Sequence, residues 1–179
     1  GYVADVYNKR TVLIGAKFFE IVAVTFGLFA FWTGRIEFML VTLFLMALHS
    51  TFFGPAKYGI VPEMLPDRDL SRANGILELT TFFAIIIGTS TGAIIFSAWK
   101  DKLVYVGVFL VAIAVAGTLT SFGITRVPSS GAKKKFELNP WGEIGSGIRR
   151  LFEDKILMLT VGGIAYFWFL GALLQMDIL

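Results

Sequence analysis

At 179 residues the chain has the length of one modest domain, but 56% of its residues are hydrophobic and its mean hydropathy is +0.74. A soluble core of this size cannot bury so much apolar surface, so the composition excludes an ordinary soluble domain. With no cysteine, the chain has no disulfide, thiolate catalysis or cysteine metal site, and one histidine, His49, argues against a histidine metal site. We therefore expect no metal and no cofactor.

The apolar residues gather into runs of about 20, the length of helix that crosses a hydrocarbon layer of about 30 Å. The predicted spans are residues 11–32, 38–58, 73–99, 103–125 and 155–176. The second span is expected to end around Gly54 and Pro55, and a polar turn follows at 59–72. The sequence thus predicts an all-α, polytopic membrane protein. The chain begins at Gly1 with no signal peptide before its first span, which suggests a piece of a longer protein.

The basic residues predict the orientation, because Lys and Arg stay on the cytoplasmic side. Of the 16 Lys and Arg residues, twelve fall on one side of the predicted spans and three on the other. The segments 1–10, 59–72 and 126–154 are therefore expected in the cytoplasm. Trp32, Trp99 and Tyr105 then fall at the outer interface, where aromatic residues are enriched.

The linker at 126–154 contains a predicted amphipathic helix. Asn139 followed by Pro140 is a helix-start signal, and apolar residues then recur at spacings of three and four: Trp141, Ile144, Ile148, Leu151 and Phe152. With Arg149 and Arg150 at its polar edge, this helix suits the surface of an anionic leaflet. An ordinary linker helix packed on the protein is the alternative.

The first motif is Gly-Tyr-Val-Ala-Asp at 1–5, followed by Lys9 and Arg10 on a cytoplasmic turn. It resembles the Gly-x-x-x-Asp signature with a basic pair that the major facilitator superfamily carries between its second and third helices. The resemblance implies a cytoplasmic latch that holds the outward-open state, formed by Gly1, Asp5, Lys9 and Arg10. The turn departs from the pattern at Asn8 and Lys9, where a glycine is common.

This alignment makes the five spans helices three to seven of a twelve-helix bundle. Residues 1–125 would then belong to the N-terminal half, 126–154 to the cytoplasmic linker between the halves, and 155–179 to the first helix of the C-terminal half. The resemblance thus implies part of a major facilitator-type helical bundle.

The second motif is Phe-Gly-Pro-Ala-Lys-Tyr-Gly at 53–59, with Ala-Asn-Gly at 73–75 and Glu78. These runs resemble the lysophospholipid transporter branch of the superfamily, which includes forms fused to acyltransferase and acyl-ACP synthetase domains. The resemblance implies a flippase that moves lysophosphatidylethanolamine and related lysophospholipids to the inner leaflet of the bacterial inner membrane for re-acylation. Its implied partners are the lysophospholipid substrate, membrane lipids and an acyltransferase or synthetase domain; no nucleic acid is expected.

Lys57 and Glu78 lie at similar depth on adjacent antiparallel spans, where they can form an ion pair or flank a cavity. A phosphate would favour the compact charge of Lys57, and an ethanolamine ammonium would favour Glu78. Tyr58 can add a hydrogen bond or a cation–π contact. The alternative is that Lys57 snorkels to the interface and Glu78 faces water.

Four other residues have simpler expected roles. Lys17 and Glu20, three apart within the first span, can pair on one helix face. Glu63 is expected to be solvated, and His49 to be a hydrogen-bonded helix residue rather than a proton relay. Because His49 stands alone, no catalytic triad is expected.

Two other functions stay open. The chain can belong to a superfamily exporter of drugs or amphiphilic metabolites, or it can be the membrane portion of a fused acyltransferase and acyl-ACP synthetase. The chain itself shows no cysteine nucleophile and no glycine-rich nucleotide loop. We therefore expect no enzyme activity from this portion.

Overall fold

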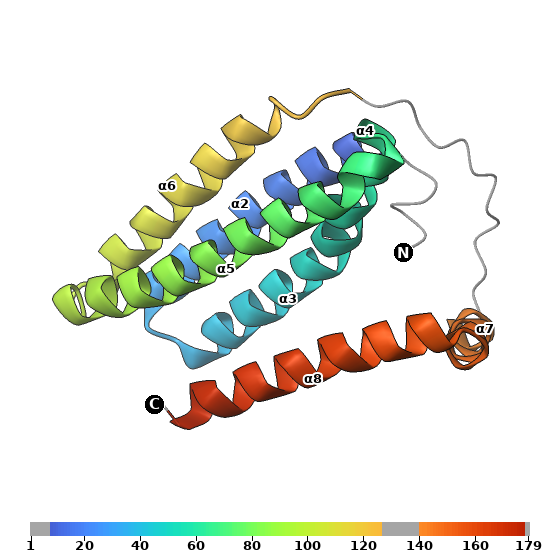
Figure 1. Ribbon diagram of the computed structural model, residues 1–179. Helices are drawn as coiled ribbons and strands as arrows, with labels where there is room; N and C mark the ends of the chain where they lie inside the picture. The colour runs from blue at the N-terminus through green and yellow to red at the C-terminus, as the bar shows by residue number, and fades with distance from the viewer. Residues whose placement is uncertain (1–7, 127–139, 178–179) are drawn as a thin grey trace. The chain divides into compact units, whose positions relative to one another are not determined.

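The computed structural model describes residues 8–126 and 140–177, and within these ranges all the regular structure is helical (Figure 1). The helices are α2 (Lys9–Thr33), α3 (Ile36–Gly59), α4 (Val61–Met64), α5 (Asp67–Ala98), α6 (Leu103–Ser121), α7 (Pro140–Glu153) and α8 (Lys155–Asp177). The chain divides into two compact units, Gly1–Lys134 and Lys135–Leu179. The all-α prediction is confirmed.

Five stretches of the described residues are long and apolar enough to cross a membrane: Lys9–Thr33, Ile36–Met64, Asp67–Ala98, Leu103–Ser121 and Lys155–Leu173. Their large apolar side chains lie mostly at the surface; α5, for example, contributes no buried residue at all. Helices that are apolar all round need an apolar environment, which lipid provides. Trp32, Trp99 and Tyr105 are also exposed, as interfacial aromatic residues should be.

Helix α2 is the centre of the first unit, packing against both α3 and α6 (Figure 1). The close approach depends on glycine. A Cβ added to Gly107 of α6 would lie 2.9 Å from Leu28 Cα, and one added to Gly27 would lie 2.9 Å from Thr42 Cγ2. Small residues of this kind let helix backbones meet in lipid, where no hydrophobic force drives helices together.

The first two spans are nearly as predicted, and their ends have clear causes. The Asn8 side chain caps α2 by accepting from the backbone N–H groups of Arg10 and Thr11, at 3.0 and 3.4 Å. Gly34 ends the helix with a left-handed backbone, φ = 66°. Helix α3 ends at Gly59, one residue beyond the predicted limit at 58, and it continues through Pro55, so the expectation of an end around Gly54 and Pro55 is wrong.

Two further boundaries correct the prediction. Much of the expected turn at 59–72 is helical: α4 forms a single turn, and α5 begins at Asp67 after the extended residue Pro66. Asp67 and Asp69 lie in the first turn of α5, where the helix dipole favours negative charge. These two charged residues therefore belong to a helix and not to the predicted turn. The fourth span ends at Ser121 rather than residue 125.

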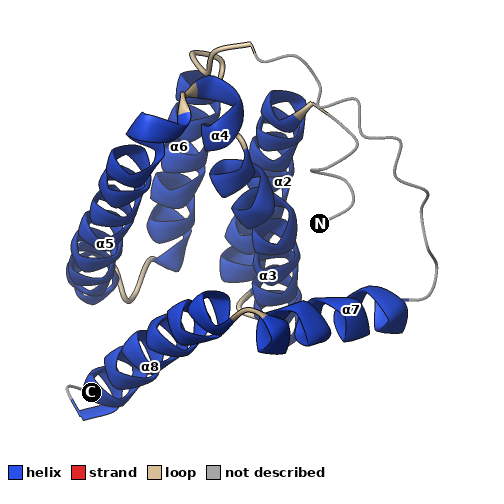
Figure 2. Ribbon diagram, turned by 45° about the vertical axis from the view of Figure 1, so that its right-hand side comes forward, coloured by secondary structure: helices blue, strands red, loops and turns tan. Residues whose placement is uncertain are grey.

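The second unit consists of α7 and α8. Helix α7 begins at Pro140, as the Asn-Pro signal predicts, and the Arg149 and Glu153 side chains pair along it at 2.8 Å. Asp154 caps the start of α8, since its Oδ1 accepts from the backbone N–H groups of Ile156 and Leu157. Figure 2 shows α8 turning away from α7 at this short connection. That α7 lies on a lipid surface stays a prediction.

Candidate functional site

An inner cavity of about 530 Å³ lies within the first unit, near the end predicted to be cytoplasmic. Lys17 and Lys57 line it, together with the hydroxyl residues Thr120, Ser121 and Thr125, and the rest of the wall is mainly apolar. Its volume falls in the range of about 300–1,000 Å³ typical of small-molecule sites. A cavity with two ammonium groups in an apolar wall suits a ligand that is partly anionic and partly hydrocarbon.

Lys57 projects across from α3 to α5. Its Nζ donates to Thr81 Oγ1 at 2.7 Å and lies 5.3 Å from the centre of the Tyr58 ring. The Thr81 hydroxyl can accept this bond because it spends its own hydrogen on the carbonyl of Leu77, at 2.6 Å. Lys57 therefore stays inside the unit, held by a neutral hydroxyl and an aromatic face.

Glu78 joins the same group through Tyr58, because its carboxylate lies close enough to interact with the Tyr58 hydroxyl. Glu78 is half-buried beside the cavity without lining it, and it forms no ion pair with Lys57. The three side chains predicted to bind substrate thus lie together in the order Glu78, Tyr58, Lys57. Sequence reasoning missed Thr81, although it lies three residues after Glu78 on the same face of α5.

The positive charge of Lys57 is not neutralised by its contacts. No carboxylate of the described residues forms an ion pair with it, and its hydrogen-bond partner carries no charge. An ammonium near hydrocarbon is costly until it meets an opposite charge or water. A phosphate that enters the inner cavity would supply that negative charge to Lys57. A ligand ammonium would instead be attracted to the carboxylate of Glu78.

Lys9 and Arg10, at the start of α2, connect this helix end to neighbouring segments. Arg10 Nε donates to the Ile124 carbonyl at 2.7 Å, and Nη2 donates to the Phe122 carbonyl at 3.0 Å, so Arg10 holds the chain that leaves α6. Such charge-assisted bonds are stronger than neutral ones, and they also oppose the negative end of the α6 dipole.

Lys9 makes the second tie, an ion pair with Glu63 of α4. Glu63 was expected to be solvated, but its side chain is only 20% exposed, so that expectation is wrong. Gly59 makes room for the pair, since a Cβ there would lie 2.8 Å from Lys9 Cε. Gly1 and Asp5, the other two predicted latch residues, lie outside the described residues.

A second charged cluster lies near the middle of α2. Lys17 Nζ pairs with Glu20 Oε2 at 2.6 Å, as their spacing predicts. Glu20 Oε2 also lies 3.7 Å from His49 Nε2. The expectation that His49 stands alone is therefore wrong. Glu20 and His49 lie the same number of residues from the α2–α3 turn, and this equal depth could have predicted their contact.

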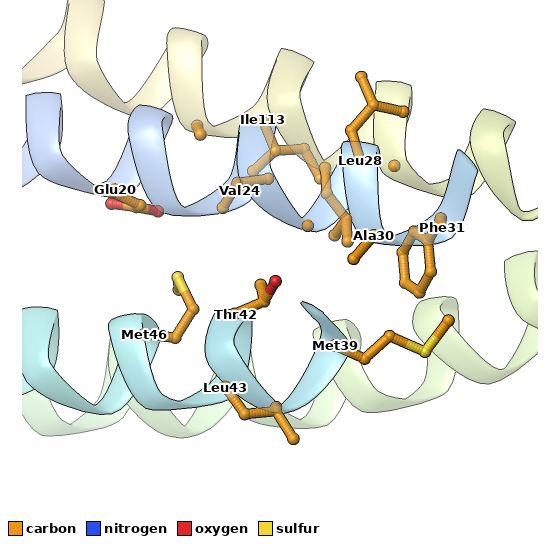
Figure 3. Close-up of a pocket in the computed structure, with 14 residues that line it drawn as sticks. Glu20, Val24, Leu28, Ala30, Phe31, Met39, Thr42, Leu43, Met46 and Ile113 are labelled. Atoms are coloured by element: carbon orange, nitrogen blue, oxygen red, sulfur yellow. The ribbon is translucent and has the colours of Figure 1, made fainter. Parts of the chain in front are cut away.

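An outer cavity of about 480 Å³ lies between α2, α3 and α6 (Figure 3). Apart from Glu20 and Thr42 its wall is apolar, with Val24 and Met46 facing it from opposite helices (Figure 3). Such a wall suits hydrocarbon. No group of three metal-ligating side chains occurs in the part of the chain that the structure describes.

Five helical stretches of the described residues are long and apolar enough to cross a membrane, and charged side chains line cavities within the first unit, as in a multi-pass membrane protein of the transporter class. The chain belongs to the Major Facilitator Superfamily, whose family model matches residues 1–178. The predicted family and fold class are thereby confirmed.

Among curated proteins, the chain is similar to the lysophospholipid transporter LplT of Yersinia pestis (strain Pestoides F) and of Yersinia pseudotuberculosis serotype O:3 (strain YPIII). In each case 26% of residues are identical over 178 residues, which is 98% of this chain and 41% of the relative. The chain thus spans about two-fifths of the length of these relatives. No solved structure shows a significant match.

Proposed function

We propose that the protein carrying this chain is a flippase that moves lysophospholipids, such as lysophosphatidylethanolamine, across the bacterial inner membrane for re-acylation. The observation that carries the proposal is Lys57, a half-buried ammonium in the inner cavity whose hydrogen-bond partner is a neutral hydroxyl. The names of the relatives support the same substrate class.

In this proposal the lipid phosphate binds Lys57 and the ethanolamine ammonium binds Glu78. Tyr58 lies between the two groups, with Lys57 Nζ 5.3 Å from the centre of its ring and the Glu78 carboxylate near its hydroxyl. The acyl chain lies against the apolar wall of the cavity. A lysophospholipid fits this arrangement because its headgroup is zwitterionic and its single chain is apolar.

Transport would proceed by rocking of two helical halves, with α2 to α6 in the N-terminal half, α8 opening the C-terminal half and residues 126–154 joining them in the cytoplasm. Arg10 and Lys9 would act in the latch that holds the cytoplasmic end closed, because both tie the start of α2 to neighbouring segments. Opening the inner cavity to the cytoplasm would require these ties to break.

The test uses the full-length protein reconstituted into vesicles, with labelled lysophosphatidylethanolamine added to one leaflet. We expect protein-dependent transfer to the other leaflet, measured as label that albumin no longer extracts, and no efflux of a cationic amphiphilic dye from the same vesicles. Dye efflux without lipid transfer would show that the protein is a drug exporter and would overturn the proposal.

A further inference from the structure

The charged cluster of Lys17, Glu20 and His49 lies deeper in the spans than Lys57, and the proposed function does not use it. The side chains of Lys17 and Glu20 are 21% and 16% exposed, and that of His49 is 8% exposed. Ionisable residues at this depth are expensive, so they mark pathways for polar groups more often than they serve packing. The cluster therefore needs an explanation of its own.

The cluster is not fully satisfied by the described residues. Lys17 and Glu20 neutralise each other, but His49 Nε2 is buried and has no hydrogen-bond partner there. Nε2 faces the same carboxylate oxygen that Lys17 holds, at 3.7 Å. A donor that reaches this point would meet a carboxylate and a ring nitrogen together. An ammonium has three N–H donors, and it suits both acceptors when His49 is neutral with its proton on Nδ1.

The two charged members of the cluster open onto different cavities. Glu20 stands at one end of the outer cavity (Figure 3), while Lys17 lines the inner cavity that also contains Lys57. His49 lines a third cavity, of about 310 Å³. The Lys17–Glu20 pair thus has one side chain in the wall of each of the two cavities.

Phe53 and Gly117 pack against the side chains of this cluster. The Phe53 ring contacts two of them: Lys17 Nζ lies 5.2 Å from its centre, and the His49 ring stacks on it at 5.4 Å. A Cβ on Gly117 of α6 would lie 3.3 Å from Lys17 Nζ, so the glycine leaves room beside the ammonium. The pair is fixed in place with space next to the lysine.

We propose that Lys17, Glu20 and His49 form a second headgroup site, at mid-depth, for a zwitterionic lipid headgroup with a phosphate and an ammonium. The phosphate replaces Glu20 on Lys17, and the ammonium replaces Lys17 on Glu20 and also donates to His49 Nε2. The Lys17–Glu20 pair is replaced by two pairs, phosphate with Lys17 and ammonium with Glu20. Both are neutral, so no net charge enters the membrane. The site rests on the proposed function and places its substrate midway between the cavities.

The test compares two lysolipids in vesicles that contain the full-length protein. Lysophosphatidylethanolamine has the ammonium, and lysophosphatidylglycerol lacks it. We expect Glu20→Gln to lower flipping of the ethanolamine lipid about tenfold more than that of the glycerol lipid, since only the former loses a charge-assisted contact. A merely structural ion pair would slow both lipids equally, and that result would overturn the inference.

Two variants complete the test. The double variant Lys17→Gln/Glu20→Gln leaves no unpaired charge, so it serves as the test if Glu20→Gln does not fold. It should also lower flipping of the ethanolamine lipid more than that of the glycerol lipid. Glu37→Gln is the matched control, because Arg35 and Glu37 form an ion pair at 3.5 Å with side chains 62% and 64% exposed. If the unmodified protein flips neither lipid, the proposed function fails and this site with it; equal losses in active variants overturn this site alone.

Discussion

Lys57→Ala is expected to lower the rate of lysophospholipid flipping about ten- to a hundredfold, because a hydrogen bond to a charged group contributes about 1.5–3 kcal/mol. The substitution leaves no buried charge unpaired, since the partner it loses is the neutral Thr81 hydroxyl. The fold should therefore persist and the loss should be in transport. Initial rates in vesicles, measured at several lipid concentrations, provide the readout.

The control for Lys57 is Arg68→Ala, which removes a basic side chain that is 86% exposed in the first turn of α5. This variant should flip lipid at the rate of the unmodified protein. Glu78→Gln should also reduce the rate, because a neutral amide loses the charge-assisted contact to the ethanolamine ammonium. If Lys57→Ala flips lipid within twofold of the unmodified protein, Lys57 has no role in handling the headgroup.

Arg10→Ala is expected to open the cytoplasmic end of the first unit. It removes two hydrogen bonds to the carbonyls of Ile124 and Phe122, and because one is only part-buried and the other is exposed to solvent, the loss from the closed arrangement is about 1–3 kcal/mol. A free-energy change of that size raises the open population about five- to a hundredfold when that population is small. The variant should therefore spend more time with its inner cavity open.

Alkylation of a single cysteine measures this opening in the full-length protein, once any cysteine outside this chain has been replaced, because the chain itself contains none. Met64 lines the inner cavity and serves as the labelled position. Met64→Cys should react several times faster in the Arg10→Ala background, whereas Arg126→Ala, an exposed change near the same end of α6, should leave the rate unchanged. Equal alkylation rates in all three backgrounds would show that Arg10 does not hold the end closed.

The sequence was informative wherever a signal is local. Runs of apolar residues predict the spans because hydropathy depends on about 20 neighbours in the chain. The helix start at Pro140 follows from two adjacent residues, Asn139 and Pro140. Lys17 and Glu20 pair within one helix, so their spacing alone was enough. Lys57 and Glu78 stood out because charges beside apolar sequence are rare.

Contacts between side chains on different helices could not be predicted in the same way. Thr81 holds Lys57, Glu63 holds Lys9, and His49 faces Glu20 because particular helices are neighbours and are rotated by their packing. Hydropathy does not encode helix rotation, since apolar residues cover every face of these spans. Small residues such as Gly107 set the approach of α6 to α2, and their effect appears only once the helices meet.

The most direct test of the account locates the headgroup itself. A structure of the full-length protein with bound lysophosphatidylethanolamine should show the phosphate within hydrogen-bonding distance of Lys57 Nζ and the ammonium beside Glu78. If the headgroup binds elsewhere while Lys57 keeps Thr81 as its partner, the inner cavity is not the substrate site.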